Sequence, residues 1–301
     1  MDLNHVRIGS GRPLLLVHGL GGSWLSWEPV LAPLSLHREV IAVDLPGFGA
    51  SPPVDGLASI GRFADAVAAF IAAAGLQGLD AVGSSLGARV VLELGRRGGS
   101  IGAVVALDPG GFWRPWERHA FYVSTWLSVG ALRLLRPVLP ALSRSRGGRS
   151  LLLARLSARP STVRPEVTLQ EMRGYASTPA MGRLLFQLAY REPDLGAPKG
   201  SFRAPLVIGW GRDDRVCPPS QAGRALALFP DARLHWFERC GHYPQWDAPE
   251  ATVRLILECT GSPGSDPAID PGHEAAPAKP VTERGAPPAP IGRQPPFRPA
   301  G

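Results

Sequence analysis

One serine in the sequence stands in a setting that favours nucleophilic chemistry. Gly83-Ser84-Ser85-Leu86-Gly87 fits the pattern G-x-S-x-G, preceded by an apolar run and followed by apolar residues at helical spacing. The motif alone is weak in a glycine-rich chain. Its setting strengthens it, because a sharp strand-to-helix turn strains the backbone of its central residue and needs small residues on either side. We expect Ser85 to project its hydroxyl above a sheet, close to the positive end of the following helix.

A serine hydroxyl is a poor nucleophile at neutral pH, so it needs a base and a group that orients the base. His242 follows the last predicted strand in Gly241-His242-Tyr243-Pro244. Three carboxylates follow earlier predicted strands, namely Asp108, Asp213 and Asp214. Residue type and position alone leave all three open as the orienting group.

Short apolar runs alternate with helical patterns along most of the chain. We predict strands at residues 13–17, 40–43, 79–82, 103–107, 205–210 and 232–237, and helices at 63–74, 85–96 and 249–259. Strands without polar alternation, separated by helices, indicate the α/β class with a mostly parallel central sheet flanked by helices. We expect a core formed by residues 1–111 and 201–260, an inserted helical lid at 112–200, and a disordered proline-rich tail at 261–301.

Composition excludes several classes of protein. A chain of 301 residues with 45% apolar and 19% charged side chains is typical of a globular protein and excludes a collagen or a disordered scaffold. Its three cysteines cannot form a disulfide framework and include no C-x-x-C pair, and Cys217 and Cys240 are expected to be buried thiols. We recognise no signal peptide, membrane span or metal-ligand spacing, so we expect a cytoplasmic protein without metal or cofactor.

The net charge of +7 is concentrated in the predicted lid, where residues 112–200 carry 14 Arg and Lys against five Asp and Glu. Arginines without an intervening acid occur there at Arg133, Arg136, Arg144, Arg146, Arg149, Arg155 and Arg159. Peripheral contact of this segment with an anionic membrane is one prediction, and a solvated helix face is the alternative. No nucleic-acid-binding motif is recognised, so no nucleic-acid partner is expected.

Five ordered segments together resemble the lidded serine hydrolases of the α/β-hydrolase superfamily. They are His18-Gly19-Leu20-Gly21-Gly22-Ser23, Asp44 to Ser51, the turn around Ser85, the Gly211-x-x-Asp214-x-x-x-Pro218 segment, and Gly241-His242. The resemblance implies that Ser85 is the nucleophile, His242 the general base and then acid, and Asp214 the group that orients His242. It also implies an oxyanion hole made by the backbone N–H groups of Leu20 and Leu86, and a structural role for His18.

Aromatic residues at the start of the predicted lid suggest what the pocket accepts. Phe112, Trp113, Trp116, Phe121, Tyr122 and Trp126, with Trp24 near the oxyanion segment, would roof Ser85 with apolar surface, although packing against the core is an equal alternative. We therefore expect a hydrolase that cleaves a carboxylic ester, or a related acyl bond, of a partly apolar small molecule through an acyl-serine intermediate. Carbon–carbon bond hydrolysis, acyl transfer, and a non-catalytic binding protein on the same scaffold remain as alternatives.

Overall fold

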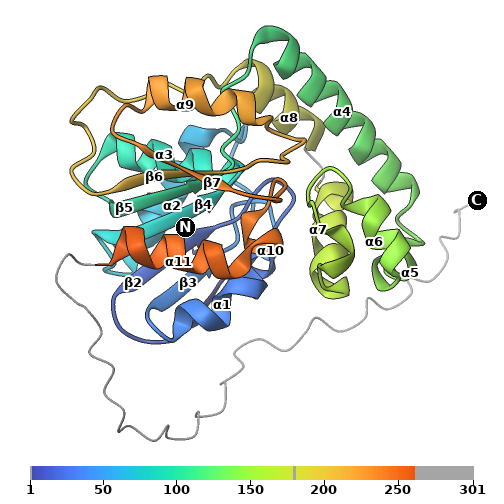
Figure 1. The fold of residues 1–301 in the computed structure, drawn as a ribbon, viewed down its shortest axis with the longest axis horizontal. Coiled ribbons are helices and arrows are strands. Elements are labelled where there is room, and N and C mark those ends of the chain that lie inside the picture. Colours follow the sequence, from blue (N-terminus) through green and yellow to red (C-terminus); the bar gives the residue numbers. More distant parts are fainter. Residues whose placement is uncertain (1, 179–180, 262–301) are drawn as a thin grey trace, which may run out of the picture. The chain divides into compact units, whose positions relative to one another are not determined.

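The computed structural model describes residues 2–178 and 181–261, which Figure 1 draws in colour. The tail predicted at residues 261–301 lies outside the described residues, apart from Gly261. The following description concerns the described part of the chain only.

A seven-stranded sheet forms the centre of the fold, and its order is β1-β3-β2-β4-β5-β6-β7. Strand β1 runs antiparallel to β3, and every other neighbouring pair is parallel, so the prediction of a mostly parallel sheet is confirmed. The strands are β1 (His5–Ile8), β2 (Pro13–Val17), β3 (Glu39–Val43), β4 (Leu79–Ser84), β5 (Ile101–Leu107), β6 (Leu206–Gly211) and β7 (Arg233–Phe237).

Helices cover both faces of the sheet because successive side chains of each strand point to opposite faces. On β2, Leu14 and Leu16 belong to a buried apolar cluster with residues of α1 (Glu28–Ser35) and α11 (Pro249–Thr260). Leu15 and Val17 belong to a second cluster on the other face. The helices of that face are α2 (Ile60–Ala73), α3 (Leu86–Arg97) and α9 (Ala222–Leu228).

A helical insertion lies between β5 and β6, as predicted, and Figure 1 draws it in green to yellow. Its helices are α4 (Pro115–Leu134), α5 (Leu139–Arg144), α6 (Arg146–Leu152), α7 (Pro165–Ser177) and α8 (Met181–Tyr190), with a short 3-10 turn η2 (Pro160–Thr162). The insertion has an apolar core that includes Leu132, Leu153 and Met172. That core also contains Tyr243 and Trp246, which follow His242 in the chain. In the described chain, no helix combines the length and apolar character that crossing a bilayer requires.

Outside the lid, β1, α1, α9 and the short α10 (Pro244–Asp247) are elements that were not predicted from the sequence. Strand β1 is a short edge strand whose side chains are mostly exposed, so it carries no buried apolar run. Helix α1 contains Pro29 and Pro33 within eight residues, which disguises its helical pattern. Pro29 is tolerated because it lies in the first turn, where the missing N–H has no helical partner.

Candidate active site

Ser85 occupies the sharp turn between β4 and α3, with backbone angles φ 53° and ψ −110°. A non-glycine residue with positive φ is strained and has to be held by its surroundings. The glycines on either side allow this close packing: a β-carbon at Gly83 would lie 2.2 Å from the carbonyl oxygen of Gly87, and one at Gly87 would lie 2.1 Å from that of Val17. The motif therefore forms the turn that the sequence predicts.

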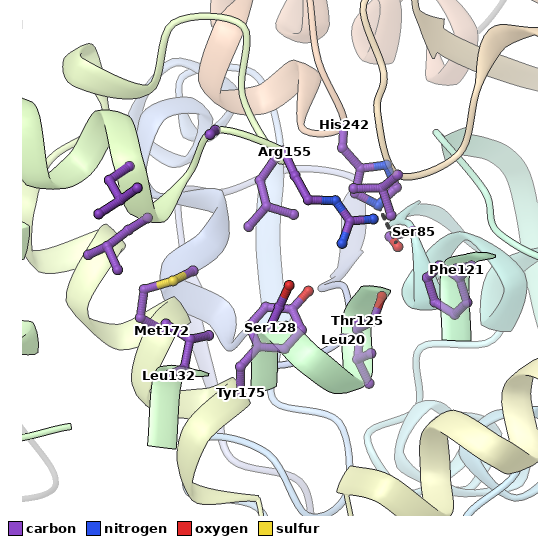
Figure 2. Close-up of a pocket in the computed structure, with 15 residues that line it drawn as sticks. Leu20, Ser85, Phe121, Thr125, Ser128, Leu132, Arg155, Met172, Tyr175 and His242 are labelled. Carbon is purple, nitrogen blue, oxygen red and sulfur yellow. Dashed lines mark hydrogen bonds between the residues drawn. The ribbon is translucent and has the colours of Figure 1, made fainter. Parts of the chain in front are cut away.

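His242 lies beside Ser85 on the loop that follows β7. Its Nε2 is 2.8 Å from the Oγ of Ser85, and its ring is buried. Figure 2 marks this hydrogen bond with a dashed line. The backbone N–H of His242 donates to the carbonyl oxygen of Leu156, a residue of the lid, at 2.9 Å. The base is therefore fixed by contacts from both the core and the lid.

Asp214 is the carboxylate that bonds to the other side of the imidazole. Its Oδ2 is 2.8 Å from the Nδ1 of His242, and both side chains are buried. The other oxygen, Oδ1, accepts hydrogen bonds from the N–H groups of Val216 and Cys217 at 2.7 and 3.0 Å. These bonds fix the carboxylate and leave Oδ2 to accept the Nδ1–H of the imidazole.

The other two candidate carboxylates do not reach His242. Asp213 is exposed, and its backbone N–H donates to the carbonyl oxygen of Cys240. Asp108 is fully buried, and its Oδ1 accepts the N–H of Gly211 at 2.8 Å. Burial, followed by the charge of Asp214, raises the pKa of Asp108 well above its ordinary value.

The loop after β2 approaches Ser85 closely. A β-carbon at Gly19 would lie 3.2 Å from the β-carbon of Ser85. His18 orders this loop: its Nδ1 bonds to the carbonyl oxygen of Gly19 at 2.7 Å, and its Nε2 accepts the N–H of Leu45 at 2.9 Å. Burial lowers the pKa of His18, which favours the neutral ring that this pattern requires.

The two predicted oxyanion donors lie on either side of Ser85. Leu86 is the first residue of α3, where backbone N–H groups have no partner within the helix. Leu20 lies on the loop after β2, lines the cavity beside Ser85, and has no acceptor for its N–H among the described residues. The assignment of both N–H groups as oxyanion donors stays a prediction.

A cavity next to Ser85 and His242 is lined mainly by lid residues (Figure 2). Helix α4 contributes one face at helical spacing, namely Phe121, Thr125, Ser128 and Leu132. The rest of the lining is Leu20, Leu151, Leu152, Ala154, Arg155, Leu156, Met172, Tyr175 and Val216. Of these residues, Phe121 was singled out as part of the pocket and Leu20 only as an oxyanion donor. The spacing from Phe121 along α4 could have indicated the helix face.

The predicted aromatic roof is therefore corrected: of the aromatic residues named for it, only Phe121 lines the cavity. Trp116 and Trp126 are exposed on other faces of α4. Trp113 stacks on Phe121 with ring centroids 4.8 Å apart, and Tyr122 packs against Phe186 and Tyr190. Phe112 and Trp24 pack with the apolar clusters on the two faces of the sheet. A helix presents only one face to a cavity, so aromatic residues spread around α4 cannot all line it.

Asp214, Cys217 and His242 form one group that is close enough to share a metal ion, within the described residues. The donor set does not favour a metal. Burial raises the pKa of Cys217 well above its ordinary value, whereas a metal ligand must be the thiolate. The Nδ1 of His242 and both oxygens of Asp214 are already engaged in hydrogen bonds.

Comparison with known proteins identifies the family to which the chain belongs. Residues 12–249 match the family described as alpha/beta hydrolase fold. The chain belongs to this family. A 2-hydroxy-6-oxo-2,4-heptadienoate hydrolase of Pseudomonas putida is 29% identical over 85% of this chain and 91% of the relative. A 2-hydroxymuconate semialdehyde hydrolase of Pseudomonas putida is 32% identical over 82% and 86%.

A solved structure supports the same fold. The meta-cleavage product hydrolase from Pseudomonas fluorescens superposes with a TM-score of 0.66 at 22% identity, covering 85% of this chain and 93% of that one. At this level of identity the likeness concerns the fold. The family match and the two relatives support a hydrolase.

Proposed function

We propose that the protein is a serine hydrolase that cleaves a carboxylic ester, or a related acyl bond, of a partly apolar substrate. One observation carries the proposal: the Oγ of Ser85 and the Oδ2 of Asp214 each lie 2.8 Å from a nitrogen of the His242 ring. The apolar majority of the cavity lining supports a substrate with an apolar acyl or alcohol part.

The reaction follows from the roles proposed for the three side chains. Ser85 Oγ attacks the carbonyl carbon while His242 Nε2 takes the hydroxyl proton, and Asp214 stabilises the resulting imidazolium. The negative oxygen accepts hydrogen bonds from the N–H groups of Leu20 and Leu86. Collapse breaks the bond to the alcohol, which leaves with the proton from His242. Water, deprotonated by His242, then attacks the acyl-serine and releases the acid and Ser85.

Replacement of Ser85 tests this proposal. Ser85→Ala should lower the turnover of p-nitrophenyl esters by about 10⁴-fold or more and abolish labelling by a fluorophosphonate probe. Ser84→Ala is the matched control, because it removes the neighbouring hydroxyl, whose contact is Gln245, and should keep both activity and labelling. Turnover by Ser85→Ala at the wild-type level would refute the assignment, and a folded wild-type protein that the probe does not label would favour a binding protein.

Carbon–carbon bond hydrolysis is the second candidate, and Arg155 favours it. Its guanidinium points into the cavity toward Ser85 and His242 (Figure 2) and forms no ion pair or hydrogen bond with the described residues. A cation without a counter-ion in a mostly apolar cavity suits an anionic substrate. The dienoate named for the Pseudomonas putida relative carries such a carboxylate.

Substrates with and without a carboxylate separate the two candidates. Arg155→Met should lower kcat/KM for a 2-hydroxy-6-oxo-dienoate by about ten-fold or more and leave kcat/KM for a neutral ester within about two-fold. Arg146→Met removes the same charge from an exposed position of α6 and should change neither value. Equal losses for both substrates in Arg155→Met would contradict a carboxylate subsite, and wild-type turnover of esters alone would favour the first candidate.

A further inference from the structure

A buried carboxylate of the lid takes no part in the chemistry proposed above. Glu171 lies on α7 and is 1% exposed. Its Oε2 accepts a hydrogen bond from the hydroxyl of Ser26 at 2.7 Å, and its Oε1 accepts one from the hydroxyl of Tyr243 at 3.2 Å. Glu171 forms no ion pair within the described residues, so its burial is not offset by a cation.

The two donors belong to the two loops that flank the reacting hydroxyl. Ser26 lies in the 3-10 turn η1 (Trp24–Trp27), directly after the loop that carries Leu20. Tyr243 is the residue after His242, and the two rings are in contact with centroids 5.1 Å apart. Glu171 therefore joins a lid helix to the loop of the oxyanion donor and to the loop of the base.

Helix α7 also packs directly on the backbone of the oxyanion loop. A β-carbon at Gly174 would lie 1.7 Å from the carbonyl oxygen of Gly21. Gly21 has φ 77°, and a β-carbon there would lie 2.7 Å from the ring of Tyr175. Because no space separates α7 from the oxyanion loop, a shift of α7 would move that loop. The carboxylate of Glu171 lies where the helix and the loop meet.

We propose that Glu171 is a positioning residue: its ionised carboxylate holds the oxyanion loop, through Ser26, and the base loop, through Tyr243, in the arrangement that is active. This inference rests on the proposed function, because it assigns Glu171 to the geometry of that reaction. An ionised carboxylate accepts both hydroxyl hydrogen bonds at once, whereas a protonated one carries a hydrogen on one oxygen, which weakens that oxygen as an acceptor or reverses the hydrogen bond there.

The surroundings of Glu171 shift the ionisation of its carboxyl group to near neutral pH. Burial raises the pKa of Glu171 to about 7, and the hydrogen bonds from Ser26 and Tyr243 oppose that shift. The titratable groups facing Glu171 are Tyr175, Tyr243 and His18. His18 lies across Gly22 from Glu171: a β-carbon at Gly22 would lie 3.2 Å from His18 Nδ1 and 3.3 Å from Glu171 Oε2. Burial raises the pKa of both tyrosines and lowers that of His18, so all three are neutral at pH 7.

Kinetics of Glu171→Gln test the proposal against Glu166→Gln, which neutralises an exposed glutamate of the same helix. Glu171→Gln should lower kcat for an ester by about ten-fold at pH 8 with KM changed less than about two-fold. Protonation of Glu171 should lower kcat by about the same factor, so between pH 8 and pH 5.5 the wild type should lose about ten-fold more activity than Glu171→Gln. Glu166→Gln should retain the wild-type kcat and pH dependence.

Stability provides a readout that does not depend on catalysis. Because the pKa of Glu171 is higher in the folded than in the unfolded chain, its contribution to stability is complete below about pH 4.5 and is lost as pH rises through about 7. Glu171→Gln should therefore unfold at a higher temperature relative to the wild type at pH 8 than at pH 5. If Glu171→Gln does not fold, Ser26→Ala and Tyr243→Phe provide the test, because each removes one hydroxyl donor to Glu171. Each variant should lower kcat by a larger factor than it changes KM.

The outcomes separate this inference from the proposed function. A wild-type kcat and pH dependence in Glu171→Gln, or a wild-type kcat in both donor variants, would overturn the positioning role while Ser85 chemistry stands. Full activity of Ser85→Ala would overturn the proposed function, and the positioning role with it, whereas the stability comparison would still establish or refute the buried ionisation of Glu171.

Discussion

Two buried carboxylates lie close behind His242, and only one of them bonds to it. Asp214 receives the imidazole N–H, whereas Asp108 receives the N–H of Gly211 and has one oxygen without a partner among the described residues. The raised pKa of Asp108 has two main causes, burial and the neighbouring charge of Asp214. The raised pKa favours the neutral form of Asp108 and so limits a second negative charge beside Asp214.

Asparagine substitutions at the two positions should therefore have different effects. Asp214→Asn should lower kcat by about 10⁴-fold, because an amide cannot hold the imidazole in the required tautomer. Asp108→Asn should keep kcat within about ten-fold, since asparagine can accept the Gly211 N–H and tolerates the φ of 45° found there. Steady-state kinetics of both variants provide the measurement, and a larger loss in Asp108→Asn than in Asp214→Asn would make Asp108 the orienting group.

Asp108→Asn should also change how the stability of the fold depends on pH. A carboxyl group with a raised folded pKa stabilises the fold below its unfolded pKa, and this contribution is lost as pH rises. Asparagine does not ionise. The unfolding temperature of Asp108→Asn relative to the wild type should therefore increase between about pH 4 and about pH 8.

At the scale of elements, the turn between β4 and α3 determines where Ser85 points. A β-carbon at Gly87 would lie 2.1 Å from backbone, whereas Gly130, in the exposed middle of α4, has open space around its Cα. Gly87→Ala should lower the free energy of unfolding by about 3 kcal/mol or more and abolish ester turnover. Gly130→Ala should raise the free energy of unfolding by about 0.5–1 kcal/mol at unchanged activity. Denaturant unfolding measures both, and a tolerated Gly87→Ala would contradict the close approach.

Elements that carry local signals were predictable from the sequence. The buried strands show uninterrupted apolar runs, and the turn around Ser85 and the Gly-His pair are short motifs, so fold class and triad candidates follow from the residues and the family resemblance. The cavity lining was not predictable in the same way. It depends on which face α4 turns toward Ser85, and the tie between Ser26 and Glu171 joins residues 145 positions apart. Such contacts are set by tertiary packing, which no local pattern encodes.

At the scale of the whole molecule, the seven lid arginines between residues 133 and 159 do not form one solvated face. Arg149 is buried and donates to the carbonyl oxygens of Ser143, Arg144 and Ser161, and Arg155 faces the cavity. The exposed members are Arg133, Arg136, Arg144, Arg146 and Arg159. Contact of this group with an anionic membrane stays a prediction, which co-sedimentation with anionic vesicles at low and high salt would check.

The attachment of the lid to the loop of His242 bears on how reactants reach the serine. Asp247 accepts hydrogen bonds from Ser157 and Ala158 on the lid side and from Gly241 on the core side, and Leu156 accepts the N–H of His242. A hinged swing of the whole insertion would break these bonds and displace the imidazole. Entry of reactant and release of product by a movement of the whole insertion would therefore disturb the catalytic centre.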